Sequence, residues 1–164
     1  MTVQRNTHKI LDRRTFLLRA GAAATLLAIL GRVPDVHAEA SAPESAEFKA
    51  TLEALLGQST PSETALTLDL PESVDNGDYV PVALSVDSPM TAQNHVKAIH
   101  LLSTANPRAA VATFRFTLLS GKAAVTSRMR LAKTQVVVAV AELSDGSFLL
   151  TRRKVDVKVG GCGI

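Results

Sequence analysis

The sequence VVVAVAELSDGSFLLTRRKVDVKV, at residues 136–159, carries the clearest strand pattern in the chain. Its first five residues, 136–140, are apolar on both faces, which is typical of a strand in the interior of a sheet. Ser144-Asp145-Gly146 then predicts a hairpin turn. A last strand is expected to follow from Phe148 to Val159, so this stretch alone predicts a pair of neighbouring strands near the C-terminus.

Shorter runs of alternating apolar residues precede this pair, and they predict strands at residues 66–70, 80–86, 96–102, 112–118 and 123–131. Turn signals separate the runs, at Asp75-Asn76-Gly77-Asp78, Ser88-Pro89, Asn106-Pro107 and Ser120-Gly121-Lys122. Pro81 indicates an edge position or the start of a strand, because proline lacks the backbone donor that a paired strand needs. About seven short strands at such spacing predict an all-β fold, an immunoglobulin-like β-sandwich.

One short helix is expected ahead of the strands. Ser45 is the predicted N-cap, residues 46–56 place apolar side chains at helical spacing, and Gly57 predicts the end of the helix. We interpret the apolar stripe as packing against the domain. The alternative is a helix that docks a partner.

The first 38 residues have the features of an export signal. Asp12-Arg13-Arg14-Thr15-Phe16-Leu17-Leu18 is a twin-arginine pattern, and residues 16–30 form an apolar segment that is short for a membrane span. Val36-His37-Ala38 supplies small residues for cleavage after Ala38, and an uncleaved anchor is the alternative. We therefore expect twin-arginine export to the periplasm, with no membrane attachment after cleavage.

The charge of the chain does not favour nucleic acid as a partner. The formal net charge is +3, but six of the 18 Lys and Arg residues and two of the 15 Asp and Glu residues fall in residues 1–38. The remainder holds 12 basic and 13 acidic residues, a net charge of −1. A near-neutral domain lacks the basic footprint of a nucleic-acid-binding protein.

The tail Val159-Gly160-Gly161-Cys162-Gly163-Ile164 contains the only cysteine. In an oxidising compartment, an odd cysteine suggests a reactive thiol or intermolecular pairing. Gly160, Gly161 and Gly163 give this segment few steric restrictions, so it predicts a narrow, flexible arm with a nucleophile near its tip. The alternative is a frayed terminus with an incidental cysteine.

Other chemistries find little support in the sequence. A strand–glycine-loop–helix phosphate cradle, a G-x-S-x-G motif and a C-x-x-C motif are all missing. Only His95 and His100 follow residue 38, and we interpret them as ordinary strand residues, so no metal site and no catalytic residue is predicted. Lys158 stands four residues before the thiol and could assist its ionisation, although a solvated strand residue is the simpler interpretation.

Several stretches resemble the SoxY family, one subunit of the periplasmic SoxYZ sulfur carrier. The resemblance rests on the Val159-Gly160-Gly161-Cys162-Gly163 tail. It is joined by Asn106-Pro107, Ser127-Arg128-Met129-Arg130-Leu131, Ala141-Glu142-Leu143-Ser144-Asp145-Gly146 and the twin-arginine leader. It implies a signal peptide at 1–38, a linker and short helix at 39–63, an immunoglobulin-like SoxY domain at 64–159 and a carrier arm at 160–164.

The resemblance also implies a function. Cys162 would be the covalent attachment point for sulfur intermediates of thiosulfate oxidation, and Gly160, Gly161 and Gly163 would let the arm enter each partner. The implied partners are a SoxZ-type subunit in a heterodimer, a c-type cytochrome conjugating enzyme, a sulfate-releasing hydrolase and a sulfur dehydrogenase. The chain would be a carrier rather than an enzyme, with no cofactor beyond the sulfur group on Cys162.

One residue departs from the family pattern. Members commonly end in glycine after the Cys-Gly step, whereas this sequence has Ile164, whose branched side chain is bulkier and stiffer. Two other functions remain open from the residues alone. They are an exported thiol-dependent oxidoreductase and a structural module that uses an intermolecular disulfide.

Overall fold

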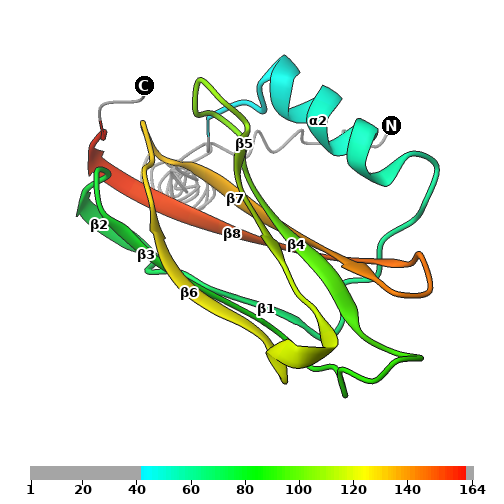
Figure 1. The fold of residues 1–164 in the computed structure, drawn as a ribbon. Coiled ribbons are helices and arrows are strands. Elements are labelled where there is room, and N and C mark those ends of the chain that lie inside the picture. The colour runs from blue at the N-terminus through cyan, green and yellow to red at the C-terminus, as the bar shows by residue number, and fades with distance from the viewer. Residues whose placement is uncertain (1–41, 162–164) are drawn as a thin grey trace, which may run out of the picture. The chain divides into compact units, whose positions relative to one another are not determined.

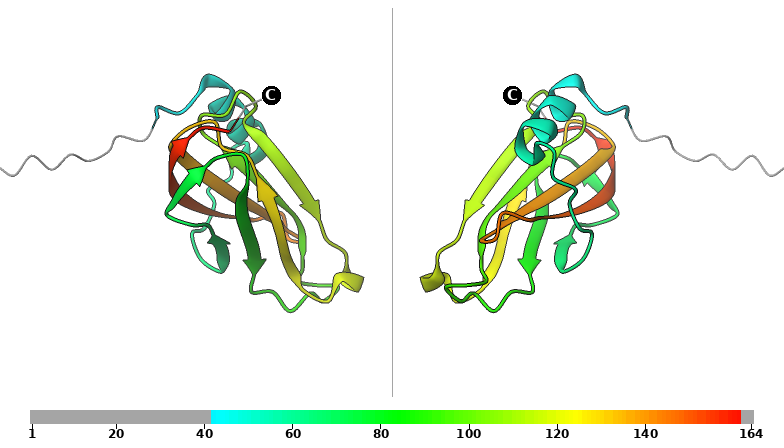
Figure 2. Two further views of the ribbon diagram at one scale, coloured as in Figure 1. Left: turned by 90° about the vertical axis from the view of Figure 1, so that its left-hand side faces the viewer. Right: turned by 90° about the vertical axis from the view of Figure 1, so that its right-hand side faces the viewer.

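The computed structural model describes residues 42–161, which form one helix, one 3-10 helix and two facing β-sheets (Figures 1 and 2). In chain order the elements are α2 (Ala46–Leu56), β1 (Leu66–Asp69), β2 (Ser73–Asn76), β3 (Val80–Val86), β4 (Val96–Ser103), β5 (Ala110–Arg115), η1 (Leu118–Ser120), β6 (Ala123–Met129), β7 (Gln135–Leu143) and β8 (Phe148–Val159). The predicted β-sandwich with a short N-terminal helix is confirmed.

The two sheets have strand orders β1-β3-β6 and β2-β8-β7-β4-β5. All neighbouring strands are antiparallel except β2 and β8, which pair in parallel. The predicted hairpin at Ser144-Asp145-Gly146 joins β7 to β8. The predicted interior position of the 136–140 run is confirmed, because β7 lies between β8 and β4.

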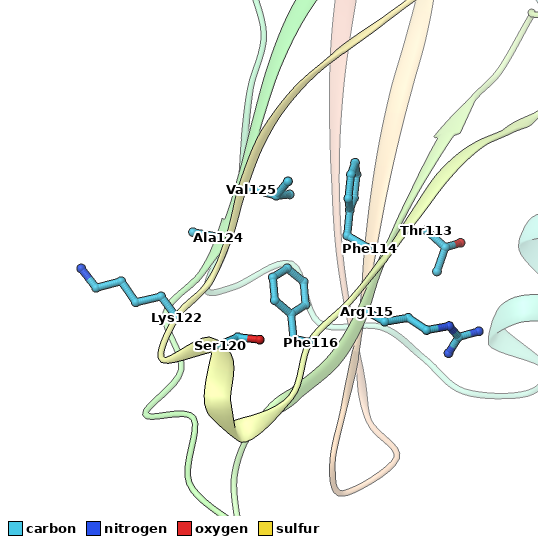
Figure 3. Close-up of a pocket in the computed structure, with 8 residues that line it drawn as sticks. All are labelled: Thr113, Phe114, Arg115, Phe116, Ser120, Lys122, Ala124 and Val125. Carbon is cyan, nitrogen blue, oxygen red and sulfur yellow. The ribbon is translucent and has the colours of Figure 1, made fainter.

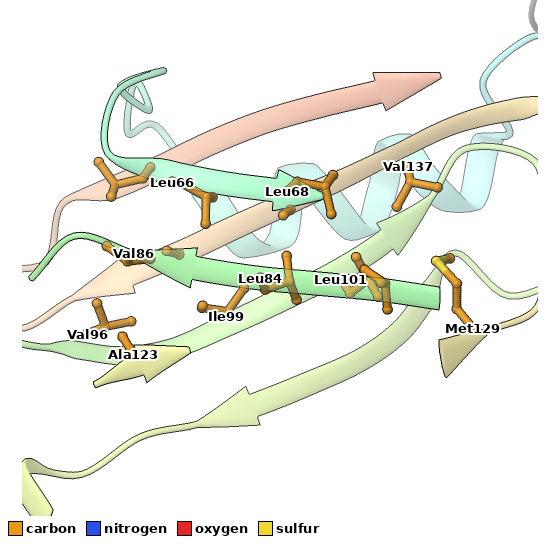
Figure 4. Close-up of a cluster of buried hydrophobic side chains, with 14 of the residues drawn as sticks. Leu66, Leu68, Leu84, Val86, Val96, Ile99, Leu101, Ala123, Met129 and Val137 are labelled. Carbon is orange, nitrogen blue, oxygen red and sulfur yellow. The ribbon is translucent and has the colours of Figure 1, made fainter. Parts of the chain in front are cut away.

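The core explains why β7 is apolar on both faces. Val137, Ala139 and Ala141 point between the sheets, where they join side chains from both layers (Figure 4). Val138 and Val140 point the other way and pack with Phe48 of α2. Two apolar layers therefore meet at β7, one between the sheets and one beneath the helix.

α2 covers the outer face of the five-stranded sheet. The Phe48 N–H donates to Ser45 Oγ at 3.1 Å, and the Gly57 N–H donates to Glu53 O at 2.8 Å, so the predicted start and end of the helix are confirmed. Phe48 is completely buried, and burial of such a side chain stabilises the docked helix by roughly 1.5–3 kcal/mol. The apolar stripe therefore packs against the domain.

The structure corrects three details. β2 was not predicted, because Ser73–Asn76 has no apolar alternation. Asp75 and Asn76, expected in a turn, are the last residues of β2, and the turn at Gly77 and Asp78 carries the chain from the five-stranded sheet to the three-stranded sheet. The run at 112–118 stops being a strand at Arg115 and turns into η1.

Pro81 is the second residue of β3. β1 pairs only with residues 83–86 of β3, so Pro81 lies beyond the end of β1 and needs no hydrogen-bond partner on that side. This position agrees with a strand start.

Candidate functional site

The candidate site lies where β8 leaves the sandwich. β8 is the longest of the described strands, with 12 residues, and it runs between β7 and β2. Val155 is completely buried, whereas Val159 is 63% exposed, so β8 leads from the core to the surface. The predicted attachment residue Cys162, with Gly163 and Ile164, lies outside the described residues, as does the predicted signal peptide at 1–38.

Three backbone hydrogen bonds tie the end of β8 to two other segments. The Gly77 N–H donates to Val159 O at 2.8 Å, the Leu131 N–H donates to Gly77 O at 2.8 Å, and the Gly161 N–H donates to Leu131 O at 2.9 Å. These bonds connect the turn after β2, the loop after β6 and the end of β8 to one another. The chain is held up to the residue before Cys162.

Glycine is required here by close packing. A Cβ on Gly77 would overlap Leu131 O, and a Cβ on Gly160 would overlap Ala132 O. A Cβ on Gly161 would stand 2.7 Å from the carbonyl carbon and oxygen of Gly77. None of these glycines has a positive φ angle, so the space available, not the backbone conformation, excludes a side chain.

Gly160 and Gly161 were predicted to serve arm flexibility, and that role stays a prediction. The packing gives a different reason for glycine at the same two positions. Gly161 is buried between the Gly77 turn and Leu131, so these residues form the base from which any arm must start.

Two amide side chains hold the loop that contacts this base. Asn106 Nδ2 donates to Arg130 O at 2.8 Å, and Asn106 Oδ1 accepts from the Ala132 N–H at 2.9 Å. Gln135 Nε2 also donates to Asn106 Oδ1, at 2.7 Å, while Gln135 Oε1 accepts from the Ala105 N–H at 2.8 Å. Gln135 is completely buried, so its hydrogen bonds are made away from water.

The sequence did not single out Gly77, Gln135 or the side chain of Asn106. Asn106-Pro107 and Asp75-Asn76-Gly77-Asp78 were interpreted as turn signals. Asn106 and Pro107 lie in the bend between β4 and β5, whereas Asp75 and Asn76 end β2 and only Gly77 and Asp78 form the turn. Their second role depends on segments that are distant in sequence. The one local signal available was a polar residue, Gln135, directly before the apolar run 136–140.

Lys158 does not lie free beside the tail. Its Nζ is 2.8 Å from Asp75 Oδ1, and the two side chains are 70% and 88% exposed. The hydrogen bond and charge of Asp75 raise the pKa of Lys158, and Lys158 lowers the pKa of Asp75 for the same reasons. This arrangement agrees with a solvated strand residue.

The two histidines are separate from the exit of β8 and from each other. His95 Nδ1 lies 3.0 Å from Thr91 O, in the loop before β4. His100 lies within β4, with Nδ1 3.1 Å from Thr113 Oγ1 and with Nε2 buried and unpartnered. Burial lowers the pKa of His100. Within residues 42–161 there is no group of three or more His, Cys, Asp or Glu placed to hold a metal ion.

A groove lies far from this exit, between the edge strands β5 and β6. It is an open groove of about 440 Å³, and in Figure 3 Phe114 and Phe116 lie on one side of it while Val125 extends into it from the facing strand. Arg115 and Lys122 extend away from it. The groove lies at the open side of the sandwich, has a lining of both polar and apolar residues, and contains no residue predicted to be functional. No helix among the described residues is long and apolar enough to span a membrane.

Comparison with known proteins relates the chain to one family. The profile described as "Sulfur oxidation protein SoxY" matches residues 52–162. The solved sulfur carrier protein SoxY from Chlorobium limicola f thiosulfatophilum is 30% identical, with a TM-score of 0.56 over 69% of this chain and 97% of that chain. Comparison with curated protein sequences found no significant match.

A more distant likeness concerns the fold alone. A superoxide reductase (neelaredoxin) from Ignicoccus hospitalis is 20% identical, with a TM-score of 0.52 over 57% of this chain and 80% of that chain. The same β-sandwich therefore occurs in proteins of a different name. The family profile, which extends through Cys162, and the likeness to the Chlorobium protein agree with each other, and we conclude that this chain belongs to the SoxY family of sulfur oxidation proteins.

Proposed function

We propose that the protein carries sulfur intermediates covalently on Cys162 and presents them to the enzymes of a periplasmic sulfur-oxidation system. Membership of the SoxY family supports a sulfur-carrier role in sulfur oxidation. The observation that supports the finer proposal is the course of β8, which runs from the buried Val155 to the exposed Val159, three residues before the only cysteine.

The chemistry needs a thiol that partners can reach. At an unperturbed pKa of about 8.5, a few per cent of the thiol is thiolate at neutral pH. Conjugation would join the thiol sulfur to the outer sulfur of thiosulfate, with loss of the thiol proton and of two electrons to a haem-containing conjugating enzyme. Hydrolysis by a second enzyme would add water, release sulfate and leave a persulfide on Cys162, without a change in the number of electrons.

The proposed partners follow from the same scheme. A SoxZ-type subunit would form a heterodimer with this chain, and a c-type cytochrome enzyme, a sulfate-releasing hydrolase and a sulfur dehydrogenase would each receive the tail in turn. The chain itself would hold the intermediate and leave catalysis to them. The twin-arginine pattern at Arg13-Arg14 supports export in the folded state, and export with a leaderless partner explains why a protein without a predicted cofactor would use this route.

The test is intact-mass spectrometry of the full chain after incubation with thiosulfate and the cognate conjugating enzyme. We expect a single thiosulfate-derived addition on the C-terminal peptide, its removal by a thiol reductant, and none on the Cys162→Ser chain. An unmodified tail, under conditions in which an established carrier is loaded, would contradict the proposal. Sulfur turnover by the purified chain alone would favour an oxidoreductase instead.

A further inference from the structure

We infer that Gly77, Asn106 and Gln135 are positioning residues for the carrier arm. Together with the loop of residues 130–133 they form what we call the arm-root clamp, which fixes the backbone up to Gly161. This inference deepens the proposed function and rests on it for its purpose, but the clamp itself involves only residues that the structure describes.

The first support is the way the end of β8 is enclosed. β2 pairs with β8 in parallel up to the pair Asn76↔Val159, so the strand is paired to its last residue. On the other side, the Val157 N–H donates to Thr134 Oγ1 at 2.9 Å. The hydrogen bonds of Gly77 and Gly161 then continue this pairing for two residues past the strand.

The second support is that the enclosing loop is itself held. Residues 130–133 have no strand partner, and Asn106 supplies both a donor and an acceptor to their backbone. Gln135 fixes Asn106 from the interior and donates a further bond to Lys133 O at 3.2 Å. A buried, fully bonded amide of this kind is costly to disrupt, because its polar atoms would lose partners away from water.

The clamp determines how far the thiol can travel. Consecutive Cα atoms are about 3.8 Å apart, so a fixed Gly161 leaves the thiol only the reach of a single residue from a fixed point. Release of Gly160 and Gly161 would add two residues, or roughly 7 Å of reach. A partner enzyme must therefore bind against this end of the sandwich, near the Gly77 turn, if the clamp stays closed during transfer.

The experiment measures amide hydrogen exchange by NMR on the full chain. We expect the Gly161 amide to be protected although it lies so near the C-terminus, and Asn106→Ala to lower its protection about tenfold, since several hydrogen bonds of the loop are lost. Asn94→Ala is the matched control, because Asn94 is exposed in the loop before β4, at the opposite end of the strands.

Two further readouts separate positioning from general stability. Ile99, completely buried in β4, reports global opening. A fall in protection at Gly161 with little change at Ile99 supports the clamp, whereas an equal fall at both would overturn the positioning role. A nitroxide on Cys162, the only cysteine, should give a sharper spectrum in Asn106→Ala and in Asn106→Asp, which keeps the acceptor but loses the donor.

The clamp and the carrier role can fail separately. Exchange of the Gly161 amide at the rate of an unstructured peptide in the unmodified chain would remove the clamp and leave sulfur loading of Cys162 untouched. Failure of Cys162 to accept sulfur, with Gly161 protected, would remove the carrier role and leave the clamp as a structural feature.

Discussion

Substitution of Gly77 by alanine is the sharpest test of the packing at the end of β8. Gly77 is buried, and an added Cβ would stand 2.7 Å from Gly161 N and closer still to Leu131 O. Ordinary contact begins at 3.4 Å, so the Gly77 turn and the tail must separate by at least 0.7 Å. A shift of this size lengthens the 2.8 Å hydrogen bonds of Gly77 to about 3.5 Å, beyond the usual limit of about 3.2 Å.

The expected loss follows from the number of hydrogen bonds at stake. Three backbone bonds join the turn, the loop and the tail, and each contributes about 0.5–1.5 kcal/mol net, so Gly77→Ala should lower the free energy of unfolding by about 3 kcal/mol. Urea denaturation followed by circular dichroism measures this directly, with the slope of the transition as a check on two-state behaviour.

Gly57→Ala is the control that separates crowding from backbone conformation. Gly57 has a φ of 56° at the end of α2, and nothing lies within 4 Å of the Cβ position. Its replacement should therefore cost only the conformational strain of a side chain at positive φ, about 1–3 kcal/mol, without loss of protection at the Gly161 amide. If Gly77→Ala unfolds within about 0.5 kcal/mol of the unmodified chain, our account of the packing is refuted.

The remaining predictions concern other parts of the molecule. Phe48→Ala should lower the free energy of unfolding by about 3–5 kcal/mol, because it opens a cavity beneath α2, and a loss below about 1 kcal/mol in urea titration would mean that the helix contributes little. Burial depresses the pKa of His100, so the unfolded state binds its proton first as the pH falls below about 6.5, and stability falls with it. The urea concentration at half-unfolding should fall less between pH 7 and pH 5 in His100→Gln than in the unmodified chain. An equal fall in both would contradict a role of His100 in this pH dependence. Lys158→Met should leave thiosulfate loading of Cys162 unchanged, since the ammonium is paired with Asp75 at the surface, and a large drop in loading rate by mass spectrometry would assign Lys158 a role at the thiol.

The parts of the fold that follow local rules were predictable from the sequence. Ser45 and Gly57 marked the helix because capping depends on residues three or four apart. The 136–140 run indicated an interior strand because both of its faces are covered, one by the second sheet and one by α2.

The parts of the fold that depend on distant segments could not be predicted from the sequence. β2 is a strand only because β8, more than 80 residues later, supplies its backbone partners. Gly77 is a turn residue by sequence and a packing residue in the fold, because Leu131 and Gly161 approach it from two other segments. Phe116 continues an alternating pattern, but its N–H donates to Lys97 O near the start of β4, and the pairing ends there.

The place of β8 within the larger sheet has a consequence for biosynthesis. β8 pairs with β2 on one side and with β7 on the other. Until residues 148–159 have been synthesised, β2 therefore lacks a sheet partner and β7 is paired only with β4. A product that stops short of Phe148 exposes two unpaired strand edges, a state open to proteolysis and aggregation. A chain that has reached the folded state therefore already contains the strand that leads to its sulfhydryl.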